Sequence, residues 1–130
     1  MMNYKHILID MDYCADPLWA TAADEGIFPN ASLKEFEKVL PRSVLHSLVV
    51  YQNLWESTYW SKYIGPSEED RKFPGDDIVY DLLRDMPPIL AAKIKQALPG
   101  CHVYYRCPET MDPIEVGTVS KNVIQPTVVG

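Results

Sequence analysis

The chain has 130 residues, 47% of them hydrophobic and 11% aromatic, which is enough to bury the core of one domain spanning residues 1–130. Its formal net charge of −6 argues against binding to nucleic-acid phosphates or to an anionic membrane, because both require clusters of Lys and Arg. No apolar run approaches the roughly 20 residues of a membrane helix, and Asp10 ends the first such run too early for a signal peptide.

The first third of the chain predicts two strands and a short helix. Residues 4–10 form a β-branched and leucine run between polar residues, which is typical of a buried strand. Residues 17–23 follow an Asp-Pro turn signal and form a second candidate strand. Ser32 is expected to begin a short helix that ends near Val39, because Glu35 stands at the capping-box position three residues later.

Two longer helices are expected in the middle of the chain. Apolar residues recur at helical spacing from Arg42 to Tyr63, which indicates an amphipathic helix. Asp76 can cap a second helix, whose apolar stripe runs over residues 79–98. Because Pro lacks a backbone donor and clashes with the preceding turn, the Pro-Pro pair at 87–88 predicts a break or kink near Asp85.

The last third returns to strands. Residues 102–107 are predicted as a strand with alternate side chains on opposite faces, and residues 114–119 and 123–129 as weaker strands. Strands at both ends with helices between them indicate an α/β fold, with α+β possible: a small sheet of three to five strands covered by three to four helices. If residues 4–10 pair in parallel with 102–107, the helices form the crossover that parallel pairing requires.

The negative charge of the chain is concentrated in two segments. Residues 6–33 hold five carboxylates and no Lys or Arg, whereas residues 66–85 hold seven carboxylates and three basic residues. Such clusters either form a solvated surface that keeps the protein soluble or bind a basic partner, such as the cationic groove of a nuclease. The candidate binding residues in these clusters are Asp10, Asp12, Asp16, Glu68, Glu69, Asp70, Asp76 and Asp77.

One aromatic residue of the first long helix lies outside its apolar stripe. Tyr51, Trp55 and Tyr59 follow helical spacing and are expected in the core. Trp60 is off that stripe and is either second-layer packing or an exposed anchor. We expect Trp60 to supply an apolar contact within a polar interface.

The three cysteines and the histidines do not form a recognisable metal or catalytic motif. An odd number of cysteines, far apart in sequence, indicates free thiols in a reducing cytoplasm. Cys101 and His102 fall on opposite faces of the predicted strand, and Cys14 has no identifiable base nearby. No metal or cofactor is therefore expected.

An enzymatic alternative starts from the apolar strand that ends in Asp10-Met11-Asp12. This pattern resembles the first motif of haloacid-dehalogenase-like phosphatases, which implies Asp10 as nucleophile, Asp12 as acid/base and Mg²⁺ held between carboxylates. The sequence departs from that family at Tyr13, which stands in place of the usual small Gly, and it has no clear Lys-bearing motif. The simpler interpretation is that both carboxylates are solvated residues at a strand end.

A second resemblance covers most of the chain. Residues 12–19 with their Leu-Trp pair, 40–45 opening a helix at Leu-Pro, and 54–59 with a Trp and a Tyr resemble small bacterial immunity-type proteins encoded beside polymorphic toxins, including those of contact-dependent growth inhibition. Residues 89–94 and 102–105 are similar to the closing helix and strand of that family. The resemblance implies a cytoplasmic protein that is not an enzyme and that binds one cognate toxin, one to one. The acidity suggests a basic nuclease as the toxin, an RNase or tRNase, occluded at its active site.

Overall fold

The structure, a computed structural model, describes residues 3–12, 14–63 and 76–117, and the side chains of all of these except 59–63, 76 and 77. Its strands form one five-stranded sheet in the order β3-β2-β1-β4-β5, and the α/β class predicted from the sequence is confirmed. The elements are β1 (His6–Ile9), β2 (Leu18–Thr21), β3 (Asn30–Ala31), the 3-10 helix η1 (Leu33–Phe36), α1 (Arg42–Tyr63), α2 (Asp76–Ala97), β4 (His102–Arg106) and β5 (Pro113–Glu115).

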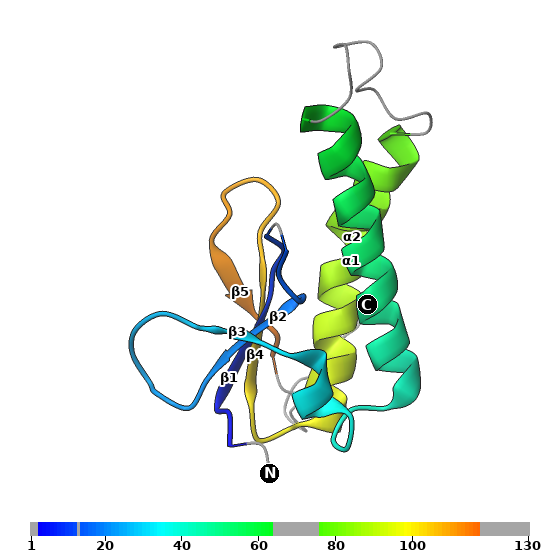
Figure 1. The fold of residues 1–130 in the computed structure, drawn as a ribbon. Coiled ribbons are helices and arrows are strands. Elements are labelled where there is room, and N and C mark those ends of the chain that lie inside the picture. Colours follow the sequence, from blue (N-terminus) through cyan, green and yellow to red (C-terminus); the bar gives the residue numbers. More distant parts are fainter. Residues whose placement is uncertain (1–2, 13, 64–75, 118–130) are drawn as a thin grey trace, which may run out of the picture.

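The parallel pairing that the sequence analysis considered as a condition is present at the centre of the sheet. β1 runs antiparallel to β2 and parallel to β4, with His6 opposite His102 and Ile9 opposite Tyr105. Since a parallel pair cannot be joined by a hairpin, α1 and α2 serve as the crossover between β1 and β4. Both helices lie on one side of the sheet, while the connection from β2 to β3 extends from the other side (Figure 1).

The core lies between the helices and one face of the sheet. Alternate residues of the strands, including Ile7 and Ile9 of β1 and Val103 of β4, are fully buried there. They meet buried apolar residues of both helices, such as Leu48 and Ile94. Because each large aliphatic side chain contributes roughly 1.5–3 kcal/mol on burial, this one-sided core fixes which face of the sheet is left uncovered.

The predicted helix after Ser32 is shorter than expected. The capping box is present: the Ser32 hydroxyl accepts from the Lys34 amide at 3.2 Å, and the Glu35 carboxylate accepts from the Ser32 amide at 3.2 Å. The element is a single 3-10 turn, Leu33–Phe36. Its last residue, Phe36, is fully buried in the core.

Of the break or kink expected near Asp85, the break is wrong. α2 continues as one helix from Asp76 to Ala97 through Pro87 and Pro88. Each Pro costs about 3 kcal/mol in a helix interior, but the turns on either side are held by tertiary packing. Pro87 itself is buried, and Leu90, Ala91 and Ile94 of the following turns belong to the core.

A buried lysine joins α2 to β4. The ammonium group of Lys95 donates to the carbonyl oxygens of Pro99 at 3.1 Å and Cys101 at 2.6 Å. Lys95 lies in the last turn of the helix, where a positive charge also opposes the helix dipole. This contact fixes where β4 begins.

The end of the chain is only partly described. β5, Pro113–Glu115, shares only Ile114 and Glu115 with the strand predicted over 114–119, of which 118 and 119 lie outside the described residues. The strand predicted over 123–129 lies outside them altogether. In the described ranges, neither long helix is apolar enough over a sufficient length to cross a membrane.

Candidate functional site

The face of the sheet that the helices leave uncovered carries a groove of about 600 Å³. This open face is formed by the alternate strand residues whose neighbours point into the core, namely His6, Leu8, Trp19, Tyr104 and Arg106. Apolar and aromatic side chains dominate the groove, with Asp10, Asp12 and Arg106 at one end. Volume and lining are those of a binding site with a few placed polar groups.

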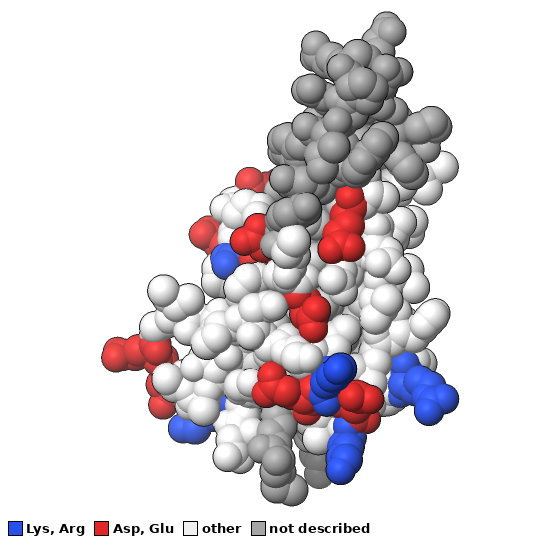
Figure 2. Space-filling model, viewed as in Figure 1, with Lys and Arg blue, Asp and Glu red and all other residues white. Residues whose placement is uncertain are grey.

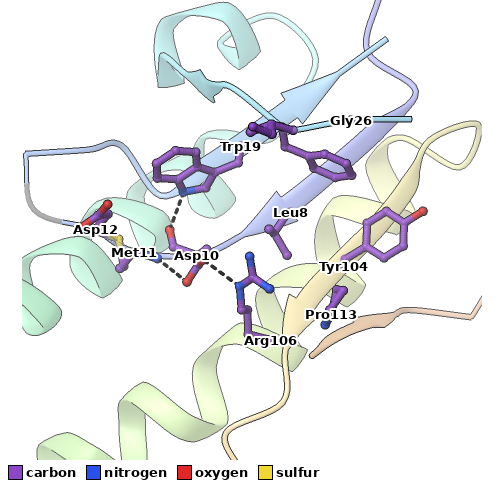
Figure 3. A pocket seen from close by; sticks show the side chains of 11 residues that line it. Leu8, Asp10, Met11, Asp12, Trp19, Gly26, Tyr104, Arg106 and Pro113 are labelled. Atoms are coloured by element: carbon purple, nitrogen blue, oxygen red, sulfur yellow. Dashed lines mark hydrogen bonds and ion pairs between the residues drawn. The ribbon is translucent and has the colours of Figure 1, made fainter. Parts of the chain in front are cut away.

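An aromatic row crosses the middle of the groove. Leu8 stands opposite Trp19 of β2 on one side and opposite Tyr104 of β4 on the other. The two residues thus share the open face on either side of Leu8, but their rings lean in opposite directions, the indole of Trp19 toward Asp10 (Figure 3) and the phenol of Tyr104 toward His6. Trp19 and Tyr104 were not among the candidate site residues, because the pairing that puts them on the same face joins segments 85 positions apart.

The loop between β2 and β3 forms a wall of the groove. Gly26 has a φ of 101°, a conformation that favours glycine, and it is followed by Ile27, which is 90% exposed. The next residue, Phe28, makes an edge contact with Tyr104 at 6.0 Å between ring centroids. The loop thus places the exposed side chain of Ile27 and the ring of Phe28, which packs against Tyr104, at the side of the groove.

Asp10 and Arg106 close one end of the groove with an ion pair. The guanidinium Nε of Arg106 donates to Oδ2 of Asp10 at 2.8 Å, and the amide of Met11 donates to Oδ1 at 2.9 Å. The side chains of Asp10 and Arg106 are 28% and 35% exposed. Each oxygen of Asp10 therefore accepts one hydrogen bond, and together the two bonds hold the carboxylate in one orientation.

Two stacked histidines lie at the other end of the open face. The rings of His6 and His102 are 4.9 Å apart and nearly parallel. His6 Nδ1 is 2.9 Å from the hydroxyl of Tyr104, and His6 Nε2 is 3.2 Å from Asp24 Oδ1. The hydrogen bond to His6 is the main reason that the pKa of Asp24 lies below its ordinary value. This network fixes the orientation of Tyr104 and ties the loop to β1.

The remaining acidic candidates of the first cluster differ in their surroundings. Asp12 is exposed and lines the groove beside Asp10. Asp16 points away from it: its carboxylate accepts from the amide of Leu33 at 3.0 Å, and its backbone amide donates to Asn30. The structure thus brings Asp10 and Asp12 together, while Asp16 holds the start of η1.

The second cluster and the aromatic anchor cannot be placed in the groove. Trp60 belongs to α1, and Asp76 and Asp77 belong to α2, but their side chains are outside the described part. Glu68, Glu69 and Asp70 lie outside the described residues altogether.

Charge divides the fold into two halves. The sheet segments, residues 3–31 and 101–117, carry eight carboxylates and two basic side chains, an excess equal to the net charge of the whole chain. The helical segments, residues 32–63 and 76–100, carry seven of each. On the face shown in Figure 2, carboxylates lie along the sheet side and also at the lower end, where most of the visible basic side chains lie. The excess of carboxylates thus belongs to the segments that build the sheet.

A second pocket of about 190 Å³ lies on the helix side of the Asp10–Arg106 pair. Tyr51 of α1 lines it and is 93% buried, being 7% exposed. Burial, and then the charge of Asp10, raise the pKa of the Tyr51 phenol, so it stays protonated. Its hydroxyl makes no hydrogen bond to another residue that the structure describes.

Comparisons with protein-family models, with curated proteins and with solved structures gave no match. Within the described part of the chain, no group of three or more His, Cys, Asp or Glu side chains is arranged to hold a metal ion. The case for a function therefore depends on the open face and its charge.

Proposed function

We propose that this chain is an immunity-type inhibitor: a protein of the bacterial cytoplasm that binds one basic toxin and neutralises it by covering its active site with the open face of the sheet. The observation that carries the proposal is the division of charge. The described sheet segments hold eight carboxylates against two basic side chains, and the sheet they form carries a groove lined by aromatic side chains on its open face.

The physical mechanism is occlusion without chemistry by this chain. A nuclease, such as an RNase or tRNase, must present a cationic surface to phosphates, and an acidic face competes for the same surface. Opposite charges also raise the rate of encounter well above that of a neutral pair. The apolar row and the exposed Ile27 then supply contacts that exclude water, which long-range charge alone cannot do.

This proposal is preferred to a phosphatase that uses Asp10 and Asp12. The ion pair with Arg106 and the Met11 amide hold both carboxylate oxygens of Asp10. In a nucleophile, one of these oxygens must approach phosphorus in line. An assay with a generic phosphate ester and Mg²⁺ distinguishes the two, since the inhibitor has no such activity for Asp10→Asn to abolish.

The experiment that tests the proposal is affinity purification of the chain from its host, at about 50 mM and about 500 mM salt. We expect one stoichiometric, basic protein that arrests growth when expressed alone and is silenced by co-expression of this chain. Recovery should fall at high salt, because the proposed attraction is screened. A partner without toxicity, or growth arrest that this chain fails to relieve, would contradict the proposal.

A further inference from the structure

We propose that the exposed face of α2 binds a second copy of this chain, in an antiparallel contact of the two α2 helices about a two-fold axis at Ile89. This inference goes beyond the proposed function and does not depend on it. Because both long helices lie on one side of the sheet, a contact through the outer face of α2 would leave the open face of each copy free (Figure 1).

An apolar stripe runs along the exposed face of α2. Ile78, Leu82 and Ile89 are 67%, 42% and 57% exposed. Their spacing of four and then seven residues places them on one side of the helix. The core residues Leu90 and Ile94 lie on a different side of α2, so the stripe faces away from the core. A continuous row of exposed apolar side chains marks a surface that binds another molecule.

Charges of opposite sign lie at equal distances on either side of Ile89. Asp85 precedes Ile89 by four residues and Lys93 follows it by four, so each stands one turn away on the same face. Both side chains are exposed. When two such helices pack antiparallel about an axis at Ile89, Asp85 of each copy comes opposite Lys93 of the other. The face is thus complementary to itself, as a two-fold interface requires.

The other apolar residues of the stripe do not give this match. An axis at Leu82 would place Asp85 of one copy opposite Val79 of the other, without an opposite charge. An axis at Ile78 lies only two residues after the start of α2 at Asp76, so the two helices would hardly overlap. The pattern of charge therefore selects Ile89 as the centre.

Both charged groups are available for the proposed pairs. Lys93 makes no ion pair with another residue that the structure describes. Asp85 pairs with Arg84 at 3.0 Å, but the two side chains are 60% and 52% exposed, and surface pairs of this kind contribute little to stability. Arg84 also pairs with Asp81 at 3.1 Å, so Asp85 can contact a second cation without leaving Arg84 uncompensated.

The distribution of charge over the fold favours contact through the helices. Two copies of a chain with a net charge of −6 repel each other. The excess of carboxylates lies in the sheet segments, whereas the helical segments carry seven carboxylates and seven basic side chains. A contact through α2 therefore brings the balanced segments together and keeps the acidic segments apart.

The size of the contact sets the expected affinity. A contact between single stripes of two helices is smaller than the roughly 1,200–2,000 Å² buried in a standard stable interface. We therefore expect a weak dimer, which forms at high protein concentration and dissociates on dilution.

The test is sedimentation equilibrium of the full chain from about 10 µM to about 1 mM. We expect the mean mass to rise with concentration from that of one copy toward that of two. Ile89→Glu should abolish the rise. Ile27→Glu is the matched control, because Ile27 is 90% exposed in the loop between β2 and β3 and its substitution should leave the rise unchanged. A single-copy mass at all concentrations, or equal effects of the two variants, would overturn the proposal.

A charge exchange tests the antiparallel arrangement itself. Asp85→Lys and Lys93→Asp each place like charges opposite each other in a pair of identical copies, so each variant alone should dimerise at least about threefold more weakly. In an equimolar mixture of the two variants, every lysine at these positions faces a carboxylate, and association should return to the wild-type level. Wild-type affinity of the single variants, or no gain on mixing, would overturn the arrangement about Ile89.

The folding of these variants is checked by circular dichroism. Both exchanged positions are exposed, so we expect both variants to keep the helical signal of the wild type. If one of them loses that signal, the comparison of Ile89→Glu with Ile27→Glu decides the proposal.

Discussion

Asp10 and Arg106 are 96 positions apart in the chain and form an ion pair of 2.8 Å at the ends of β1 and β4. The pair divides the groove on the open face from the smaller pocket on the helix side, and both residues line both spaces. Parallel pairing of the two strands is the cause, because it brings the C-terminal ends of β1 and β4 to the same edge of the sheet. The acidic residue that the sequence suggested as a binding group thus also has a structural role.

This role predicts that Asp10→Asn destabilises the fold by about 1–2 kcal/mol. The substitution leaves the half-buried guanidinium of Arg106 without its charged acceptor. Chemical denaturation in urea measures the change. Asp12→Asn removes the same charge from an exposed position of the same turn and should stay within about 0.5 kcal/mol. Equal effects of the two substitutions would show that the ion pair adds nothing to stability.

Tyr51→Phe should leave the free energy of unfolding unchanged or raise it. The buried hydroxyl of Tyr51 makes no hydrogen bond within the described part of the chain, so its removal relieves a desolvation cost. Thermal unfolding of wild type and variant provides the measurement. Tyr4→Phe is the comparison, because its hydroxyl donates to Glu35 at 2.7 Å. A loss above about 1 kcal/mol in Tyr51→Phe would mean that the hydroxyl has a bound partner in solution.

Lys95→Met should lower the free energy of unfolding by about 1–3 kcal/mol. The ammonium group satisfies the carbonyls of Pro99 and Cys101, and methionine fills similar space without a donor. Lys93→Met, two residues earlier on an exposed side of α2, serves as the control. Urea unfolding of both variants decides the matter; a Lys95 variant as stable as the Lys93 variant contradicts the assigned link between α2 and β4.

Stability should fall in alkaline solution. Desolvation is the main reason that the phenol pKa values of Tyr51 and Tyr104 lie above the ordinary 10.0. In the unfolded chain these phenols lose their protons near pH 10, whereas in the folded chain they keep them. Deprotonation therefore stabilises the unfolded state, and the free energy of unfolding falls as the pH rises. Below pH 10 the phenols are protonated in both states, so the free energy of unfolding is not reduced by their ionisation.

Urea denaturation from about pH 8 to about pH 11 follows this loss directly. Tyr51→Phe should flatten the decline above pH 10, because it removes the phenol with the larger rise in pKa. A stability that stays constant over this range, or a variant with the same slope as the wild type, would rule out the assigned role of these tyrosines.

The sequence predicted those parts of the fold that depend on local pattern. Helical spacing located α1 from Arg42 to Tyr63, and the Ser32–Glu35 spacing located the capping box. The order of strands and helices was compatible with the parallel pair of β1 and β4, but it did not determine the order of strands in the sheet. Of the break or kink predicted near Asp85, the break was wrong because packing of the neighbouring turns outweighed a local preference.

The candidate site could be predicted only in part. The acidity of the first cluster was visible, but the partners of its members were not, since Arg106 reaches Asp10 and Leu33 reaches Asp16 across long stretches of chain. Trp19 and Tyr104 become a pair only through the register on both sides of Leu8. The alternation of side chains along a strand could have placed each of the two rings on the face opposite the core. It could not have shown that the two residues stand on strands that flank β1.

Two charge reversals of equal size, compared in the affinity purification from the host, test most directly whether the open face binds the toxin. One variant carries Asp12→Lys and Glu25→Lys in the sheet segments, and the other carries Glu37→Lys and Asp81→Lys in the helical segments; all four side chains are exposed. We expect recovery of the basic partner at low salt to fall at least about tenfold for the sheet variant and to be unchanged for the helical variant. Equal loss in both, or retention by the sheet variant, would contradict the claim that the open face binds the toxin.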